Sequence, residues 1–200
     1  MIEADLVDKM VAWRRALHAH PETAFEEVST ARLVASALRD YGFEVTEGVG
    51  KTGVVGTLRR GSGPALGLRA DMDALPMVEY NEFEHRSQHS GKMHACGHDG
   101  HTAMLLGAAA SLSRDTGWHG TARATVGAAK VTLGCKPSMA PEDFAFMAQA
   151  KPGAYVWMRV DGPEPGAPLH NPHYDFNDDA LATGASYWVN VVKAFGAARV

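Results

Sequence analysis

The sequence concentrates metal-binding side chains in one short stretch, residues 94–101. The donors in this stretch are His94, Cys96, His98, Asp99 and His101. Imidazole nitrogen and thiolate sulfur are the ligands that zinc-like ions prefer. Cys96 and His98 fall on one side of an extended turn, and the glycine between them lets the backbone approach a ligand closely. The stretch therefore predicts a metal site.

Two plainer explanations of this stretch stay open. In the first, the histidines cap a helix and bond to backbone groups without a metal. In the second, they belong to a closed structural zinc site, which usually takes two pairs of cysteine or histidine ligands. Cys135 has no neighbouring donor with which to make such a pair. A structural zinc site also predicts that a chelator unfolds the chain.

Two acidic residues, Asp71 and Asp73, follow a segment with the composition of a buried strand, residues 65–69. Residues two apart in an extended segment point the same way, whereas on a helix they do not. In open α/β sheets, ligands bind at this end of the strands. We expect the two carboxylates to orient a ligand histidine or to touch a metal, since metal-bound histidines commonly need such support. The alternative is a pair of solvated turn acids.

Weaker candidates lie further along the chain. His170 and Asn171 occupy a polar loop, residues 169–178, where a histidine is more often an ordinary surface residue. Glu142 follows Pro141 in the first turn of a predicted helix, a position that the helix dipole favours for any acid. Neither position predicts a site by itself.

The elements that must position these residues alternate between helices and strands. Hydrophobic spacing predicts helices over residues 6–17 and 26–41, and composition and helix-start residues predict further helices over residues 102–112, 141–151 and 178–195. Strands are predicted over residues 43–46, 53–58, 65–69, 120–126 and 154–160. The class is therefore α/β with a central sheet and no internal repeat.

Composition excludes several functions. The 200 residues are enough for one main domain, and 19 basic against 23 acidic side chains give a net charge of −4. The basic residues are scattered, so we expect no nucleic-acid partner. No run of 18 or more apolar residues exists, which predicts no membrane partner. The start lacks the features of a signal peptide and the two cysteines form no disulfide framework, so we expect a cytoplasmic protein.

Five short runs together resemble a known family over nearly the whole chain. They are His18 to Glu22 (HAHPE), Arg69 to Pro76 (RADMDALP), His94 to Ala103 (HACGHDGHTA), Glu142 to Phe144 (EDF) and Leu169 to Pro172 (LHNP). They occur in the order in which the metal-dependent amidohydrolases carry them. This group includes hippurate hydrolase, N-acyl-amino-acid amidohydrolase and auxin-conjugate hydrolase, within the zinc-type aminoacylase/carboxypeptidase superfamily.

The resemblance implies a fold and a set of site residues. The fold is a three-layer catalytic domain with a central mixed sheet flanked by helices. Residues 1–200 would form this single domain from two parts, 1–125 and 126–200, joined where the family carries a lid or dimerisation domain. The implied metal ligands are Cys96, His98 and His170, supported by the acid Asp73. Candidates for supporting the ligands or lining the substrate pocket are Asp71, Asp99, His101, Glu142 and Asn171.

The reaction that the resemblance implies is hydrolysis of the amide bond of N-acyl amino acids such as hippurate. In the family, two divalent ions (Zn²⁺, Mn²⁺, Ni²⁺ or Co²⁺) activate a water, and one of them polarises the acyl carbonyl. A glutamate moves the proton from the water to the leaving amine. The only expected partner is therefore a small N-acyl amino acid.

The sequence departs from the family in one segment. Members carry a Gln-Pro-Ala-Glu-Glu motif before the lid, which supplies the general base and a metal ligand, and a further ligand histidine downstream. Between Thr116 and Pro141 this sequence has no Asp or Glu, and its only histidine is His119. The departure predicts one bound metal or none, and no family-type dimer. The alternative function is an inactive relative that binds a metal or an acyl amino acid.

Overall fold

The computed structural model describes residues 2–62, 65–118, 144–160 and 166–197. The chain divides into two compact units: Met1–Thr125 with Val160–Val200, and Val126–Arg159. The larger unit contains α1 (Ala4–Ala19), α2 (Val28–Asp40), β1 (Glu44–Val49), β2 (Gly53–Thr57), α3 (His98–Arg114) and α5 (Ala180–Ala197). The smaller unit contains α4 (Phe144–Ala150). The prediction of a single two-part domain stays a prediction.

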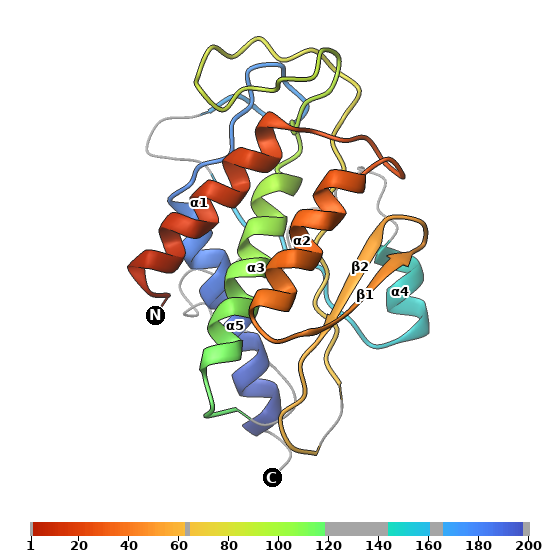
Figure 1. Cartoon of the computed structure of the whole chain (residues 1–200), viewed down its shortest axis with the longest axis vertical. Coiled ribbons are helices and arrows are strands. Elements are labelled where there is room, and N and C mark those ends of the chain that lie inside the picture. The colour runs from red at the N-terminus through yellow and green to blue at the C-terminus, as the bar shows by residue number, and fades with distance from the viewer. Residues whose placement is uncertain (1, 63–64, 119–143, 161–165, 198–200) are drawn as a thin grey trace. The chain divides into compact units, whose positions relative to one another are not determined.

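Helix α3 is the centre of the larger unit. It packs against α1, α2 and α5, and Figure 1 shows α1 and α2 running on either side of it. Small residues allow this close approach. Gly107 is one of them, since a Cβ built there would lie 2.0 Å from the sulfur of Met10 on α1. Most of α3 is therefore buried, and the position of its first turn is fixed by packing on several sides.

The flanking helices bury one face each. On α1 the buried apolar residues Leu6, Met10 and Leu17 recur at helical spacing. Helix α2 ends just before Gly42, whose φ of 77° is readily adopted by glycine. Towards the far end of α3, Leu112 and Trp118 form an apolar cluster with residues of α5. Most predicted helices are confirmed to within a few residues, but α3 begins four residues before its predicted start.

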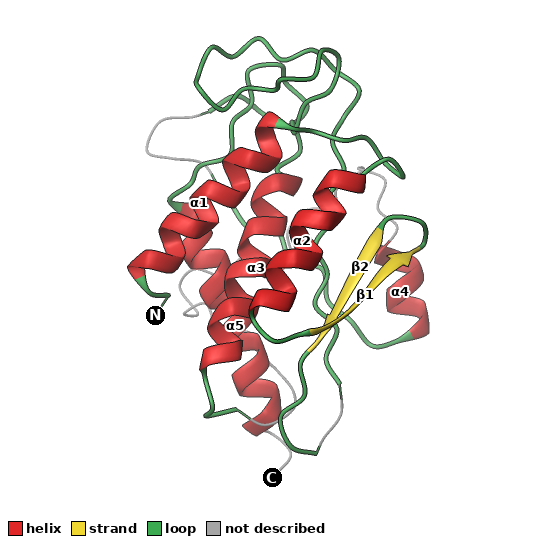
Figure 2. Ribbon diagram, viewed as in Figure 1, coloured by secondary structure: helices red, strands yellow, loops and turns green. Residues whose placement is uncertain are grey.

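The described residues contain one sheet, made of two strands. β1 and β2 pair antiparallel, from Glu44 opposite Thr57 to Val49 opposite Gly53, with an irregularity between Glu47 and Val49. Figure 2 shows this hairpin beside α2. Leu38 of α2 packs on its inner side, where a Cβ at Gly56 would lie 3.0 Å from the Leu38 Cδ1 atom.

Two of the predicted strands are wrong, and a third lies outside the described residues. Residues 65–69 and 154–160 have no strand structure, and the segment 120–126 is not described. A strand is defined by its hydrogen-bonded partner, which local composition does not specify. Both segments lack a buried face as well: Leu66 is 36% exposed and Trp157 58%. The three-layer arrangement with a central mixed sheet therefore stays a prediction.

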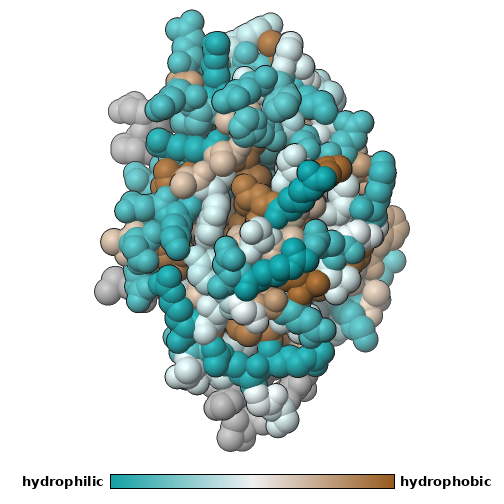
Figure 3. All heavy atoms as spheres, in the orientation of Figure 1, coloured by the Kyte–Doolittle hydropathy of each residue, from teal (hydrophilic) through white to brown (hydrophobic). Residues whose placement is uncertain are grey.

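Polar side chains predominate on the face drawn in Figure 3, and apolar ones show only in small separate areas. Within the described part of the chain, no helix has both the length and the apolar character needed to cross a membrane.

Candidate metal centre

The first turn of α3 carries two of the predicted site residues. His98 and His101 are three residues apart on this helix and therefore share a face, with their ring centroids 5.5 Å apart. Gly97 precedes the helix with a φ of 86°, which glycine adopts without strain. A Cβ at Gly97 would also lie 2.9 Å from the hydroxyl of Tyr174, so the site requires glycine here for two reasons.

The segment with the paired acids lies against this turn. Nδ1 of His98 lies 2.8 Å from the backbone oxygen of Asp73 and 3.0 Å from its carboxylate. Nδ1 of His101 lies 2.8 Å from Oδ1 of Asp71. Thr102 also donates to the backbone oxygen of Asp71, at 3.0 Å. The structure thus brings both acids beside the histidines. Their role in supporting or binding a metal stays a prediction.

Cys96 contacts both His98 and His170. The Nε2 atom of His170 is 3.4 Å from the sulfur of Cys96, and the thiol belongs to no disulfide. The backbone N–H of His170 donates to the carbonyl of Ala95 at 2.7 Å. This hydrogen bond joins the loop of residues 169–178 to the stretch of residues 94–101. His170 has a φ of 63°, an uncommon value for a residue other than glycine. Cys96 thus contacts His170, and it is also a hydrogen-bond partner of His98.

The surroundings of His98 favour positive charge at its ring. Burial alone would lower the pKa of His98, but hydrogen bonds with Asp73 and Cys96 outweigh it and raise the pKa to about 11. Burial would likewise raise the pKa of Asp71, yet its hydrogen bond with His101 and the charge of His98 hold that pKa at about 2. The hydrogen bond with His98 lowers the pKa of Asp73. The acidic neighbours of His98 therefore stabilise a positive charge at this position.

A buried ionic network lies behind the first turn of α3. The side chain of Asp99 is fully buried and points inward, with Oδ2 at 2.8 Å from Nδ1 of His18 and 3.8 Å from Arg14. Nε2 of His18 lies 3.1 Å from Glu79. Burial opposes ionisation of Asp99, but the hydrogen bond with His18 and nearby charges hold its pKa well below the usual value. Asp99 therefore joins α3 to α1.

His94 is buried beside this network. Its side chain is 1% exposed, and within the described residues neither ring nitrogen has a hydrogen-bond partner. Burial lowers its pKa to about 4, so the ring is neutral at pH 7. An unpaired atom of Asp99, Oδ1, is also buried. Unpaired buried polar atoms are rare in folded proteins, and ordered water commonly satisfies them.

The remaining predicted residues have other positions. The side chain of Asn171 accepts from the backbone N–H of His173 at 2.8 Å, so it shapes the loop that carries His170. Glu142 lies outside the described residues. The network residues Arg14, His18 and Glu79 were not predicted as site residues. His18 occurs in one of the short runs that carry the family resemblance, whereas no sequence pattern around Arg14 or Glu79 indicates a role in the site.

The donors present fit a divalent metal ion. Imidazole, thiolate and carboxylate are all ligands of zinc-like ions. His98 has the supporting contact that metal-bound histidines usually show, because its second ring nitrogen is held by a carbonyl and a carboxylate. One ligand atom each from Asp71, His98 and His101 lies within 4.8 Å of the other two.

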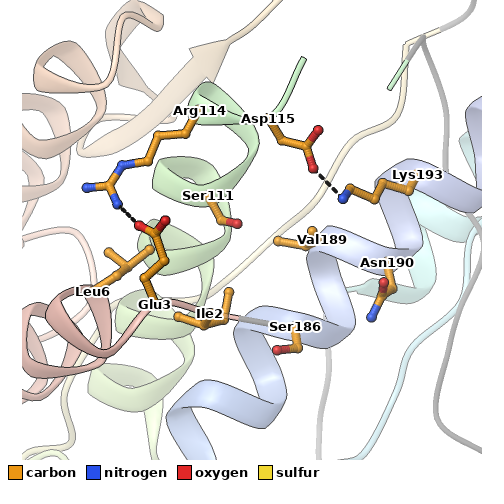
Figure 4. A pocket seen from close by; sticks show the side chains of 10 residues that line it. All are labelled: Ile2, Glu3, Leu6, Ser111, Arg114, Asp115, Ser186, Val189, Asn190 and Lys193. Atoms are coloured by element: carbon orange, nitrogen blue, oxygen red, sulfur yellow. Dashed lines mark hydrogen bonds and ion pairs between the residues drawn. The ribbon is translucent and has the colours of Figure 1, made fainter. Parts of the chain in front are cut away.

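A separate pocket of about 300 Å³ lies near the other end of α3 (Figure 4). Its lining residues come from α1, α3 and α5 and from the segments just before α1 and just after α3. Its charged groups are paired, Arg114 with Glu3 and Lys193 with Asp115. His98 begins α3 and Arg114 ends it, so the length of the helix separates this pocket from the metal-type donors. None of its lining residues has an unpaired positive charge that could bind a substrate carboxylate.

The fold and site define a chain in which a buried helix presents a cluster of metal-type donors at its first turn. The model of peptidase family M20/M25/M40 matches residues 67–121 and 112–194, more than half of the chain. The chain therefore belongs to this family, which confirms the resemblance stated from the sequence.

Characterised relatives match about half of this chain. IAA-amino acid hydrolase ILR1-like 5 of Arabidopsis thaliana is 52% identical over 108 residues, covering 54% of this chain and 25% of the relative. Hippurate hydrolase of Campylobacter jejuni is 50% identical over 110 residues, covering 54% of this chain and 29% of the relative. The matched part of the chain thus spans about a quarter of these proteins.

A solved structure also matches only part of this chain. The YxeP protein of Bacillus subtilis, described as a dinuclear metal binding peptidase from the M20 family, is 37% identical with a TM-score of 0.55. The match covers 58% of this chain and 33% of that protein. The match supports part of the family's catalytic domain in this chain.

Proposed function

We propose that this chain carries the metal-binding part of an amidohydrolase that cleaves the amide bond of N-acyl amino acids. The observation that carries the proposal is the cluster around His98, where Asp73 contacts Nδ1 of the ring and both Cys96 and Asp71 also contact His98. The relatives named hippurate hydrolase and IAA-amino acid hydrolase support the substrate class. A free thiol at the site suits a reducing cytoplasm.

The residues of this chain would have distinct roles. His98 would bind a divalent cation, with Cys96 and His170 as the ligands that the family resemblance assigns beside it. A divalent cation supplies a Lewis acid that polarises an acyl carbonyl and lowers the pKa of water. Asp73 holds Nδ1 of His98 and so directs Nε2 into the site. The buried network of His18 and Asp99 keeps the first turn of α3 in place.

A second function is favoured by one feature of the sequence. Residues 116–141 contain no Asp or Glu, so they supply no general base of the family type. Loss of such a base typically lowers a rate by a factor of about 10²–10⁴. The chain would then bind a metal or an acyl amino acid without efficient turnover.

Glycine release from benzoylglycine separates the two functions. With Mn²⁺ or Zn²⁺ added, the amidohydrolase proposal predicts release that a chelator abolishes and that His98→Ala eliminates. The exposed His89 provides the matched control, and His89→Ala should keep the rate of the unaltered chain. Metal-dependent binding of benzoylglycine without release would contradict hydrolysis and support the binding function.

A further inference from the structure

Arg14 is a charged side chain of α1 that is almost completely buried. Its exposed fraction is 1%, although an arginine is not a metal-type donor. Its Nε donates to Oδ1 of Asp178 at 2.7 Å, and its Nη1 donates to Oδ1 of Asp175 at 2.7 Å. A buried charge is costly unless it is paired, so these two carboxylates account for the burial of the guanidinium.

The two acids that Arg14 binds lie on either side of Phe176 in the sequence. Phe176 is 2% exposed, and its ring packs against the first turn of α3, where a Cβ at Gly100 would lie 2.3 Å from it. A guanidinium presents its donors in a rigid planar fork, so it fixes both carboxylates relative to α1. Arg14 therefore restrains both ends of the stretch that packs against the first turn of α3.

His170 lies earlier in the same loop. Its Nε2 is 3.4 Å from the sulfur of Cys96. Its φ of 63° is uncommon for a residue other than glycine, and such a conformation persists only where the surrounding structure holds it. The chain between His170 and Asp175 is short and turned, with the N–H of Tyr174 donating to the carbonyl of Asn171 at 2.9 Å. A displacement of Asp175 would therefore move His170 relative to Cys96.

Two other contacts hold the loop from a less regular part of the chain. The N–H of Tyr80 donates to the carbonyl of Pro172 at 2.9 Å, and the side chain of Asn81 donates to the carbonyl of Tyr174 at 3.0 Å. Neither donor lies in a helix or strand, whereas Arg14 belongs to the 16-residue helix α1. Because α1 packs closely on α3, the bonds of Arg14 connect the loop to the helical packing of the larger unit.

We propose that Arg14 is a positioning residue that holds the loop of residues 169–178, and with it His170, beside Cys96. It acts through the carboxylates of Asp175 and Asp178. The inference rests on the proposed function only in taking His170 as a metal ligand. It deepens that function by adding a helix residue on which the position of this ligand depends.

Amide hydrogen exchange of the full 200-residue chain without metal tests the positioning directly. In Arg14→Gln the amides of the loop should exchange at least about tenfold faster, because two charge-assisted hydrogen bonds are lost. The amides of α2 should keep their rate. Arg15→Gln is the matched control: Arg15 binds the other oxygen of Asp178 at 3.0 Å, but it is 50% exposed. Exposed ion pairs contribute little, so loop exchange in Arg15→Gln should match that of the unaltered chain.

A second variant changes the loop partner of the same bond. Asp175 is 36% exposed, so Asp175→Asn buries no new group, and it should accelerate loop exchange in the same direction as Arg14→Gln. Circular dichroism checks that each variant is folded, and each tests the inference alone if the other does not fold. Unchanged loop exchange in either folded variant would overturn the inference, as would an equal acceleration throughout α2.

Zn²⁺ affinity tests whether Arg14 acts through His170, and competition with a chromophoric chelator measures it. Arg14→Gln should lower the affinity by about 10–100-fold, as the loss of a group that supports a metal ligand commonly does. In a His170→Ala background the same substitution should change the affinity by less than about threefold, since the ligand through which Arg14 acts is already removed. An equal loss in both backgrounds would overturn the inference.

A failure of the proposed function gives a different result. A chain that binds no Zn²⁺ contradicts the proposed function, whereas faster loop exchange in Arg14→Gln still supports the positioning role. Metal-dependent glycine release, with loop exchange and Zn²⁺ affinity both unchanged in Arg14→Gln, supports hydrolysis and overturns the inference.

Discussion

At the scale of single residues, His18 is a buried titratable side chain with two acidic partners. Its ring is completely buried between Asp99 and Glu79, and both ring nitrogens face a carboxylate. Burial alone would lower the pKa of His18, but the hydrogen bonds with Asp99 and Glu79 raise it to about 9. The protonated ring therefore links α1, α3 and the segment before the metal-binding stretch.

The stability of the chain should depend on pH through His18. Its pKa rises from 6.5 to about 9 on folding, so the protonated ring stabilises the folded state. That contribution is complete below about pH 6.5 and is lost as the pH rises through about 9, with a magnitude of roughly 3 kcal/mol. Urea unfolding at pH 6 and pH 9 measures it. His18→Gln should remove most of the difference; an equal pH dependence in the variant would contradict the prediction.

The spacing of single residues indicated several members of the candidate site, whose roles as metal ligands or supports stay predictions. Asp71 and Asp73 were expected to support ligand histidines, and the structure places them beside His101 and His98. The network of Arg14, His18 and Glu79 could not be predicted, since these residues come from segments distant in the sequence. Their association depends on how α1 packs on α3, which no local pattern specifies.

At the scale of elements, the close packing of α3 fixes the position of its first turn, which carries the site residues. Gly100 lies in its first turn against Phe176, in the segment that follows His170. A Cβ at Gly100 would lie 2.3–2.6 Å from three atoms of the Phe176 ring, which is 2% exposed. A rigid buried ring cannot move aside cheaply, so glycine is required here for close approach.

Gly100→Ala should therefore destabilise the chain. Overpacking costs about 1–3 kcal/mol, which outweighs the gain in helix propensity of about 1 kcal/mol. Gly67 is the matched control, because a Cβ there meets nothing within 4 Å and its φ is not positive. Gly67→Ala should change the free energy of unfolding by less than about 1 kcal/mol. Equal stability of the two variants in urea would contradict this account of α3.

Helices were easier to predict than strands for a physical reason. A helix closes its hydrogen bonds within one segment, so spacing in the sequence is sufficient to indicate α1, α2 and α5. A strand needs a partner elsewhere in the chain. β1 and β2 are adjacent hairpin strands and were predicted, whereas residues 65–69 have strand composition but no partner in the described part of the chain.

At the scale of the whole molecule, the metal-type donors and the pocket of Figure 4 are independent features. Arg114 lines that pocket and is 41% exposed, with acidic partners on the segment before α1 and on α1 itself. Exposed ion pairs contribute about 0–1 kcal/mol. Arg114→Gln should thus change stability by less than about 1 kcal/mol and leave metal affinity unaltered, as thermal melts and calorimetry can check. A fall in metal affinity would show that the two features are coupled.

The central claim is that this member of the M20/M25/M40 family binds a divalent metal at the first turn of α3, with His98 as an essential ligand. The most direct measurement is the metal content of the intact chain after dialysis against Zn²⁺, compared with His98→Ala and His89→Ala. We predict a single ion per chain in the unaltered protein and in His89→Ala, and none in His98→Ala. Equal metal content in all three proteins would contradict the claim.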